Sequence, residues 1–214
     1  MANATYETEV RFGSGANYAE TKDDGEIELH GTAKTWEDLR IIPGAFQFPG
    51  VADPTLEDWQ PGGAGATFKV YKFLKNDEVH FTCQIPHNYQ EGSDIKPHIH
   101  WTPCDRGVAE NGNTVGWKID YSWANTDAVF AASATVDLSH ACSGTDDLHE
   151  LTASGTITGT NKTISSILVI RLYRSDTNGD DTWVGATAAL SPAILEFDIH
   201  YEIDSLGSDL ELVK

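Results

Sequence analysis

The sequence predicts an all-β fold, an antiparallel two-sheet β-sandwich of the jelly-roll type. Apolar residues recur with a period of two along most of the chain, helical periodicity is nearly absent, and turn residues separate the apolar runs. In residues 115–123 and 193–203 every second side chain is apolar, and the residues between them are mostly polar. Strands of this kind bury one face on a core and turn the other toward water or an interface.

Six further segments carry the same signal and are predicted to be strands, residues 68–74, 78–85, 95–101, 128–138, 148–157 and 164–174. Within the last of them, residues 167–170 are continuously apolar, which predicts a strand that is covered on both faces. The best helical signal is a single turn at residues 35–39, which Pro43 and Gly44 would end. Eight strands of this spacing favour a jelly roll.

The chain divides into a loop-rich arm, residues 1–65, and the sandwich, residues 66–214. Residues 41–50 are apolar but contain two prolines, so they are not expected to form a sheet of their own. We expect this segment to pack on the sandwich or on a neighbouring subunit. The residues predicted for such an interface are Ile41, Ile42, Phe46 and Phe48.

Composition limits the classes of function. With 40% hydrophobic residues among 214, the chain can bury a sizeable core. The net charge of −19 repels phosphate groups, so direct binding to nucleic acid or to a membrane is not expected. The N-terminal residues do not read as a secretory signal. The three widely spaced cysteines predict reduced thiols in a protein that is made in a cytoplasm.

Three histidines form the first candidate site. His98 and His100 are two residues apart on one predicted strand, and His200 occupies the polar face of the last strand. Because Ile99 and Ile199 face the core, parity places all three histidines on the outer side of a sheet, where they are expected to lie close together. Such a cluster is a possible zinc, nickel or iron site, and the alternative is a set of hydrogen-bonded histidines. A His-x-His strand is also found in cupins, but the glutamate that follows in cupins is missing here.

A second candidate is a calcium loop at Asp176, Asn178 and Asp180, which have oxygen ligands at alternate positions. The following glycine and the twelfth-position glutamate of such loops are missing, so a polar hairpin turn is the alternative. No catalytic residues are predicted, because the chain has no nucleophile elbow, no phosphate-binding glycine loop and no His-Glu-x-x-His motif. A pair of carboxylates from distant strands, as in glycosidases, stays open.

Four segments resemble a pattern in uncharacterised proteins of tailed-phage and prophage genomes. They are residues 36–40, 84–101, which contain Pro97-His98-Ile99-His100-Trp101, 117–123 and 197–208, and together they run in order over most of the chain. The resemblance implies a viral origin and a structural role in the virion. It carries no catalytic residue to this sequence.

The predicted function is therefore that of a non-enzymatic viral structural protein, a capsid, decoration or tail-associated component. We expect a symmetric homo-oligomer, with a trimer favoured, that contacts other virion proteins and is located in the virion. The many aromatic residues support an interface, because aromatic side chains are enriched there. The alternatives are a carbohydrate-binding module for host attachment and a cupin-like metal-dependent enzyme. No cofactor is expected other than a possible divalent metal.

Overall fold

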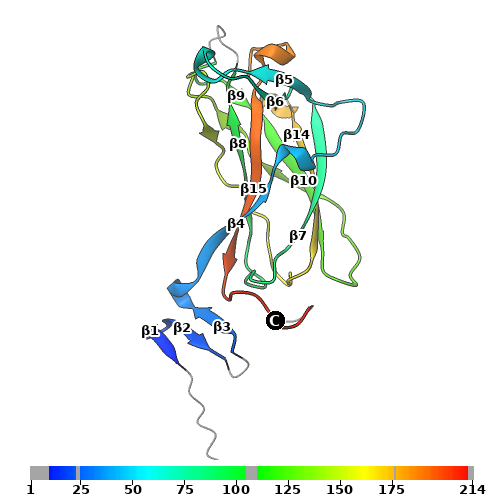
Figure 1. The fold of residues 1–214 in the computed structure, drawn as a ribbon. Helices are drawn as coiled ribbons and strands as arrows, with labels where there is room; N and C mark the ends of the chain where they lie inside the picture. The colour runs from blue at the N-terminus through cyan, green and yellow to red at the C-terminus, as the bar shows by residue number, and fades with distance from the viewer. Residues whose placement is uncertain (1–9, 23–24, 105–109, 176, 212–214) are drawn as a thin grey trace, which may run out of the picture.

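Two antiparallel sheets packed face to face form the body of the protein (Figure 1), which confirms the predicted fold class. The computed structural model describes residues 10–22, 25–104, 110–175 and 177–211. Every pairing between its named strands is antiparallel. Within the described residues no α-helix forms, and no helix is long and apolar enough to cross a bilayer.

The larger sheet has six strands. Its order is β13 (Glu150–Leu151), β8 (Lys96–Thr102), β15 (Ala193–Ile203), β6 (Phe68–Lys72) and β5 (Thr55–Trp59). The remaining strand, β4 (Thr35–Ile41), pairs with the C-terminal part of β15, whereas β6 pairs with its first two residues. Strand β15 is thus flanked along most of its length by β8 on one side and by β4 and β6 on the other.

The second sheet has four strands, β11 (Ala134–Asp137), β10 (Trp117–Ala124), β14 (Ile167–Arg174) and β7 (Glu78–Gln84). A short pair, β9 (Thr114–Val115) and β12 (His140–Ala141), lies outside both sheets. The strands predicted at residues 128–138 and 148–157 are much shorter than expected. Only β11, β13 and an isolated bridge between Ile157 and Ile95 form there.

A three-stranded sheet of β1 (Arg11–Ser14), β2 (Asn17–Thr21) and β3 (Ile27–His30) extends from one end of the sandwich (Figure 1). The Leu29 amide donates a hydrogen bond of 2.6 Å to the Asp204 carbonyl, which links β3 to the chain after β15. Five 3₁₀ turns complete the described structure, η1 (Gly31–Ala33), η2 (Pro43–Ala45), η3 (Pro61–Gly63), η4 (Thr177–Gly179) and η5 (Ala188–Leu190).

Aromatic side chains from both sheets fill the core. Phe81 of β7 meets Phe197 of β15 at a ring-centroid distance of 5.0 Å. Trp101 of β8 contacts Trp117 of β10 at 6.4 Å and Trp183 at 6.0 Å. Four of the six tryptophans are buried, so the aromatic surplus that we expected at an interface is smaller than composition suggests.

Two local predictions are wrong. Residues 35–39 form strand β4 and not a helical turn, because the exposed edge of β15 offers seven residues a continuous set of hydrogen-bond partners. The apolar run at residues 167–170 is covered on one face only. Leu168 and Ile170 are buried, whereas Ile167 and Val169 are each 37% exposed.

The predicted interface residues separate into two pairs. Ile41 and Phe46 are buried in the core of their own chain, so they present no surface to a partner. Ile42 is 60% exposed and Phe48 is 40% exposed. Strands β4 and β5 come from the predicted arm but belong to the larger sheet, and the division at residue 65 stays a prediction.

Candidate functional site: a histidine–aspartate cluster

The register between β8 and β15 brings three histidines to one place. His98 lies directly opposite Asp198, and His200 follows Asp198 on the same face of β15. On the other face, Ile99 and Ile199 are fully buried in the core. The cluster therefore lies on the outer side of the larger sheet, as strand parity requires.

The carboxylate of Asp198 is the centre of this cluster. The His98 Nε2 atom lies 2.6 Å from Asp198 Oδ1. On the other oxygen, Asp198 Oδ2, the Nε2 atoms of His100 and His200 lie at 3.3 Å and 3.9 Å. The rings of His98 and His200 meet edge to face, with their centroids 4.2 Å apart. Three imidazoles thus surround one carboxylate.

The inner part of the cluster is shielded from water. His98 is 2% exposed and Asp198 is 3% exposed. Within the described chain, His98 Nδ1 and Asp198 Oδ1 have no hydrogen-bond partner of good geometry, although Oδ1 is close to His98 Nε2. Burial alone would raise the pKa of Asp198, but the imidazoles of His98 and His100 outweigh it and hold that pKa below its ordinary value. The carboxylate is therefore charged at neutral pH.

The outer part of the cluster is open. His200 Nε2 lies 2.7 Å from Asp38 Oδ1 on β4, and His100 Nδ1 lies 2.7 Å from His149 Nε2. A surface depression of about 440 Å³ is lined by Asp38, His100 and His149, and Arg40 and Glu196 form an ion pair on its wall. Small ions and ligands can reach His100 from this depression, and the His200 side chain is itself partly exposed.

Sequence parity predicts the meeting of His98, His100 and His200, and the structure brings the three together. Parity alone does not predict that Asp198 lies at the centre of the cluster, although Asp198 is on the same polar face of the strand. A carboxylate two residues before His200 was the available signal. Asp38 and His149 come from segments whose pairing partners are not readable from sequence, so no local pattern identifies them.

The second predicted site stays untested. Asp176 and the side chain of Asn178 lie outside the described residues. The carboxylate of Asp180 pairs with Lys118, whose Nζ atom lies 2.5 Å from Asp180 Oδ2. The Lys118 ammonium group is thus already paired with one of the three side chains that were predicted to bind calcium.

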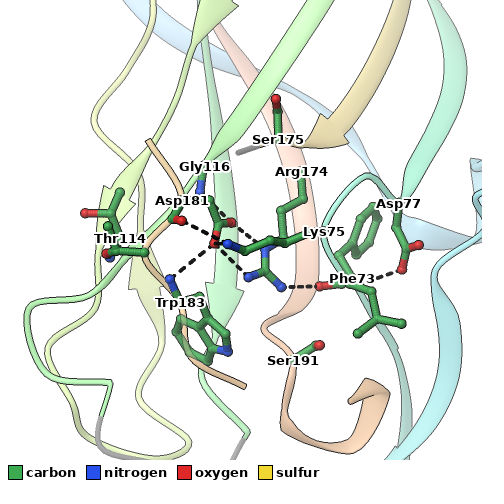
Figure 2. A network of polar contacts seen from close by, with 12 residues as sticks. Phe73, Lys75, Asp77, Thr114, Gly116, Arg174, Ser175, Asp181, Trp183 and Ser191 are labelled. Atoms are coloured by element: carbon green, nitrogen blue, oxygen red, sulfur yellow. Dashed lines mark hydrogen bonds and ion pairs between the residues drawn. The ribbon is translucent and has the colours of Figure 1, made fainter. Parts of the chain in front are cut away.

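The next residue, Asp181, belongs to a buried polar network (Figure 2). Arg174 donates from Nε to Asp181 Oδ2 at 2.5 Å and from Nη2 to Asp181 Oδ1 at 2.9 Å. Both side chains are fully buried. The carboxylate also accepts hydrogen bonds from the Gly116 and Trp183 amides, and Arg174 Nη1 donates to the Phe73 carbonyl. The network attaches the segment after η4 to both sheets and serves the fold.

No family model matches this chain, and no curated protein matches it. Among solved structures, the receptor-binding domain of the spike protein P1 from bacteriophage PM2 is similar over 73% of this chain and 98% of that chain, with 9% identity and a TM-score of 0.32. A structure of that protein's stem and receptor-binding domain covers 79% of this chain and 96% of its own, at 11% identity and a TM-score of 0.27.

A third similar structure is TmCBM61 in complex with β-1,4-galactotriose, which covers 79% of this chain and 88% of its own, at 11% identity and a TM-score of 0.27. At these identities and TM-scores, no residue and no activity can be transferred to this chain. The candidate site must be interpreted from its own chemistry. Imidazole and carboxylate groups in this arrangement can hold a proton or a cation.

Proposed function

We propose that this protein is a non-enzymatic structural component of a virion and that it works as a symmetric homo-oligomer. The jelly-roll-like sandwich supports this proposal, since such sandwiches are common capsid building blocks. The tailed-phage pattern in residues 84–101 and 197–208 supports it as well. The strongest structural support comes from the apolar edge of the larger sheet.

The apolar surface belongs to residues 42–68, which contain β5, the edge strand of the larger sheet, and a stretch that is hydrogen-bonded to β7 of the second sheet through Gln47 and Ala52. Strand β5 is the outermost strand of its sheet, so one row of its backbone hydrogen-bonding groups has no neighbouring strand among the described residues. Large apolar side chains in this segment remain exposed, Ile42, Phe48, Val51, Leu56 and Phe68. An apolar outer strand is a template for pairing with another chain. We infer that the partner is a second copy of this protein, because identical subunits can repeat such a contact around a symmetry axis.

The extension formed by β1–β3 fits the same role. It projects beyond the end of the sandwich (Figure 1), and Phe12 on β1 is largely exposed. A sheet this small buries little apolar surface by itself and gains stability from packing against another chain. The extension would then reach a neighbouring subunit.

Charge substitutions at the edge test the proposal. In Ile42→Asp/Phe48→Asp, two exposed side chains become charged, so the monomer should fold while the oligomer dissociates. Sedimentation velocity at micromolar concentration should show a smaller species than for the wild type. The control is Val129→Asp, which places a charge at an apolar residue outside this segment that is more exposed, 94% accessible.

An unchanged sedimentation coefficient in the double variant would contradict the proposed edge. Glycan-array binding by the wild type addresses the alternative function. Saturable binding to a defined sugar, in a protein that sediments as a monomer, would favour a carbohydrate-binding attachment module over a structural subunit.

A further inference from the structure

We propose that His98, Asp198 and His200 bind a divalent transition-metal ion of the zinc class, with Asp38 orienting His200 from the solvent side. The inference rests on the geometry of the cluster and is independent of the proposed virion role. It changes the ligand set expected from sequence, because Asp198 replaces His100 among the three principal ligands.

The distances are suitable. One ligand atom from each of His98, Asp198 and His200 lies within 4.8 Å of the other two. Ligand atoms on a tetrahedral ion at about 2.1 Å are separated by roughly 3.4 Å. The 2.6 Å between His98 Nε2 and Asp198 Oδ1 would widen by less than about 1 Å, and the ligand atom of His200, which lies within 4.8 Å of the other two, would move inward. Small side-chain rotations supply such shifts.

Two buried atoms indicate a missing ligand. Asp198 Oδ1 and His98 Nδ1 lack hydrogen-bond partners within the described chain, and both side chains are more than nine-tenths buried. Buried polar atoms are usually satisfied by protein, water or an ion. A cation bound to Asp198 Oδ1 would satisfy the carboxylate. Either ring nitrogen of His98 is available, because Nε2 faces Asp198 and Nδ1 is unpaired.

The donor set selects the class of ion. Two imidazole nitrogens and one carboxylate oxygen suit zinc, iron, cobalt or nickel, whereas calcium and magnesium prefer oxygen ligands alone. His200 Nε2 lies 2.7 Å from Asp38 Oδ1, so His200 would bind the ion through Nδ1 while Nε2–H donates to Asp38, which is the usual outer-shell arrangement that orients a ligating imidazole. Because His200 and Asp38 are partly exposed, the ion can enter from solvent and a water molecule can complete its coordination.

A second cluster, Glu20, Glu28 and His30, has similar ligand spacing but different surroundings. Arg11 forms an ion pair with Glu20, and Lys22 forms one with Glu28. These cations already balance the carboxylates. No basic side chain among the described residues other than histidine pairs with Asp198 in this way. The second cluster therefore supplies a matched control.

The test is calorimetric titration of Zn²⁺ into untagged, chelator-treated, full-length protein, together with Co²⁺ absorption spectra. We expect saturable binding of one ion per chain, and visible Co²⁺ bands of nitrogen and oxygen coordination. Asp38→Asn should weaken Zn²⁺ binding by about 10- to 100-fold, as is typical of outer-shell partners. His200→Ala removes a ligand and should weaken it further. His30→Ala, in the second cluster, should bind as the wild type does.

Circular dichroism establishes that each variant is folded. If His200→Ala does not fold, Asp38→Asn and the wild-type Co²⁺ spectrum still decide the outcome. Absence of saturable Zn²⁺ and Co²⁺ binding to the wild type would overturn the proposal, and the cluster would be a metal-free imidazole–carboxylate network. Loss of binding in His30→Ala, with none in His200→Ala, would also overturn it.

Discussion

Several ionisable side chains are buried in this sandwich, and Asp77 shows how burial changes the pKa of a carboxyl group. It lies in the turn between β6 and β7, where its Oδ2 accepts a hydrogen bond of 2.6 Å from the Leu74 amide (Figure 2). Burial raises the pKa of Asp77 from the ordinary 3.8 to about 6, despite the opposing effects of that hydrogen bond and of nearby Arg174. Between these two pH values the folded chain binds a proton more tightly than the unfolded chain does.

Stability should therefore fall as Asp77 ionises. Relative to Asp77→Asn, the wild type should lose up to about 3 kcal/mol of unfolding free energy between about pH 4 and pH 7, since each pKa unit corresponds to about 1.4 kcal/mol. Urea denaturation of both proteins at several pH values measures this difference. Asp58→Asn, at an exposed carboxylate paired with Lys69, is the control for removal of a surface charge. If the difference in unfolding free energy between the wild type and Asp77→Asn were the same at every pH, burial would not raise the pKa of Asp77 in this way.

The burial of individual side chains could be predicted where apolar and polar residues alternate without interruption. Alternation in residues 78–85 predicts that Val79, Phe81, Cys83 and Ile85 face the core; three of them are buried there, and Cys83 is partly buried. Leu195 was predicted on the inner face of β15 but is only partly buried. A bulge between Ile194 and Glu196 shifts the register, so Ile194 occupies the core position instead. A bulge adds one residue to a strand and reverses parity on one side of it, and no local pattern marks this one.

At the scale of elements, neighbouring segments in the fold determine whether a stretch of chain forms a strand and how long that strand is. β4 is a strand because β15 offers it an edge, and β13 is short because only Glu150 and Leu151 pair with β8. Residues 180–187, between η4 and η5, form no helix or strand and are held in place by side-chain hydrogen bonds. Glu110 accepts hydrogen bonds from the Val184 and Gly185 amides, and Asp181 joins Arg174.

The Arg174–Asp181 pair should be the most sensitive polar contact in the sandwich. Asp181→Asn leaves a buried guanidinium without its counter-charge and should destabilise the fold by about 3–5 kcal/mol. Thermal or urea unfolding measures the loss. The neighbouring substitution Asp180→Asn breaks the more exposed pair with Lys118 and should cost about 1 kcal/mol or less. Equal losses in the two variants would show that burial does not govern the strength of these pairs.

At the scale of the whole molecule, the fold class was predictable because period-two patterning determines which faces are buried. Strand order was not, since β15 pairs with β4, β6 and β8 from three distant parts of the sequence. The same limit applies to the histidine cluster. Parity predicts that His98, His100 and His200 leave the core on the outer side, but only the pairing of β8 with β15 centres them on Asp198.

The central proposal is that this sandwich is one subunit of a symmetric assembly. Multi-angle light scattering of the wild-type protein at micromolar concentration, coupled to size-exclusion chromatography, measures the mass directly. The favoured trimer of the 23.3 kDa chain predicts about 70 kDa, maintained on tenfold dilution. A single species of 23.3 kDa at every concentration would contradict the proposal.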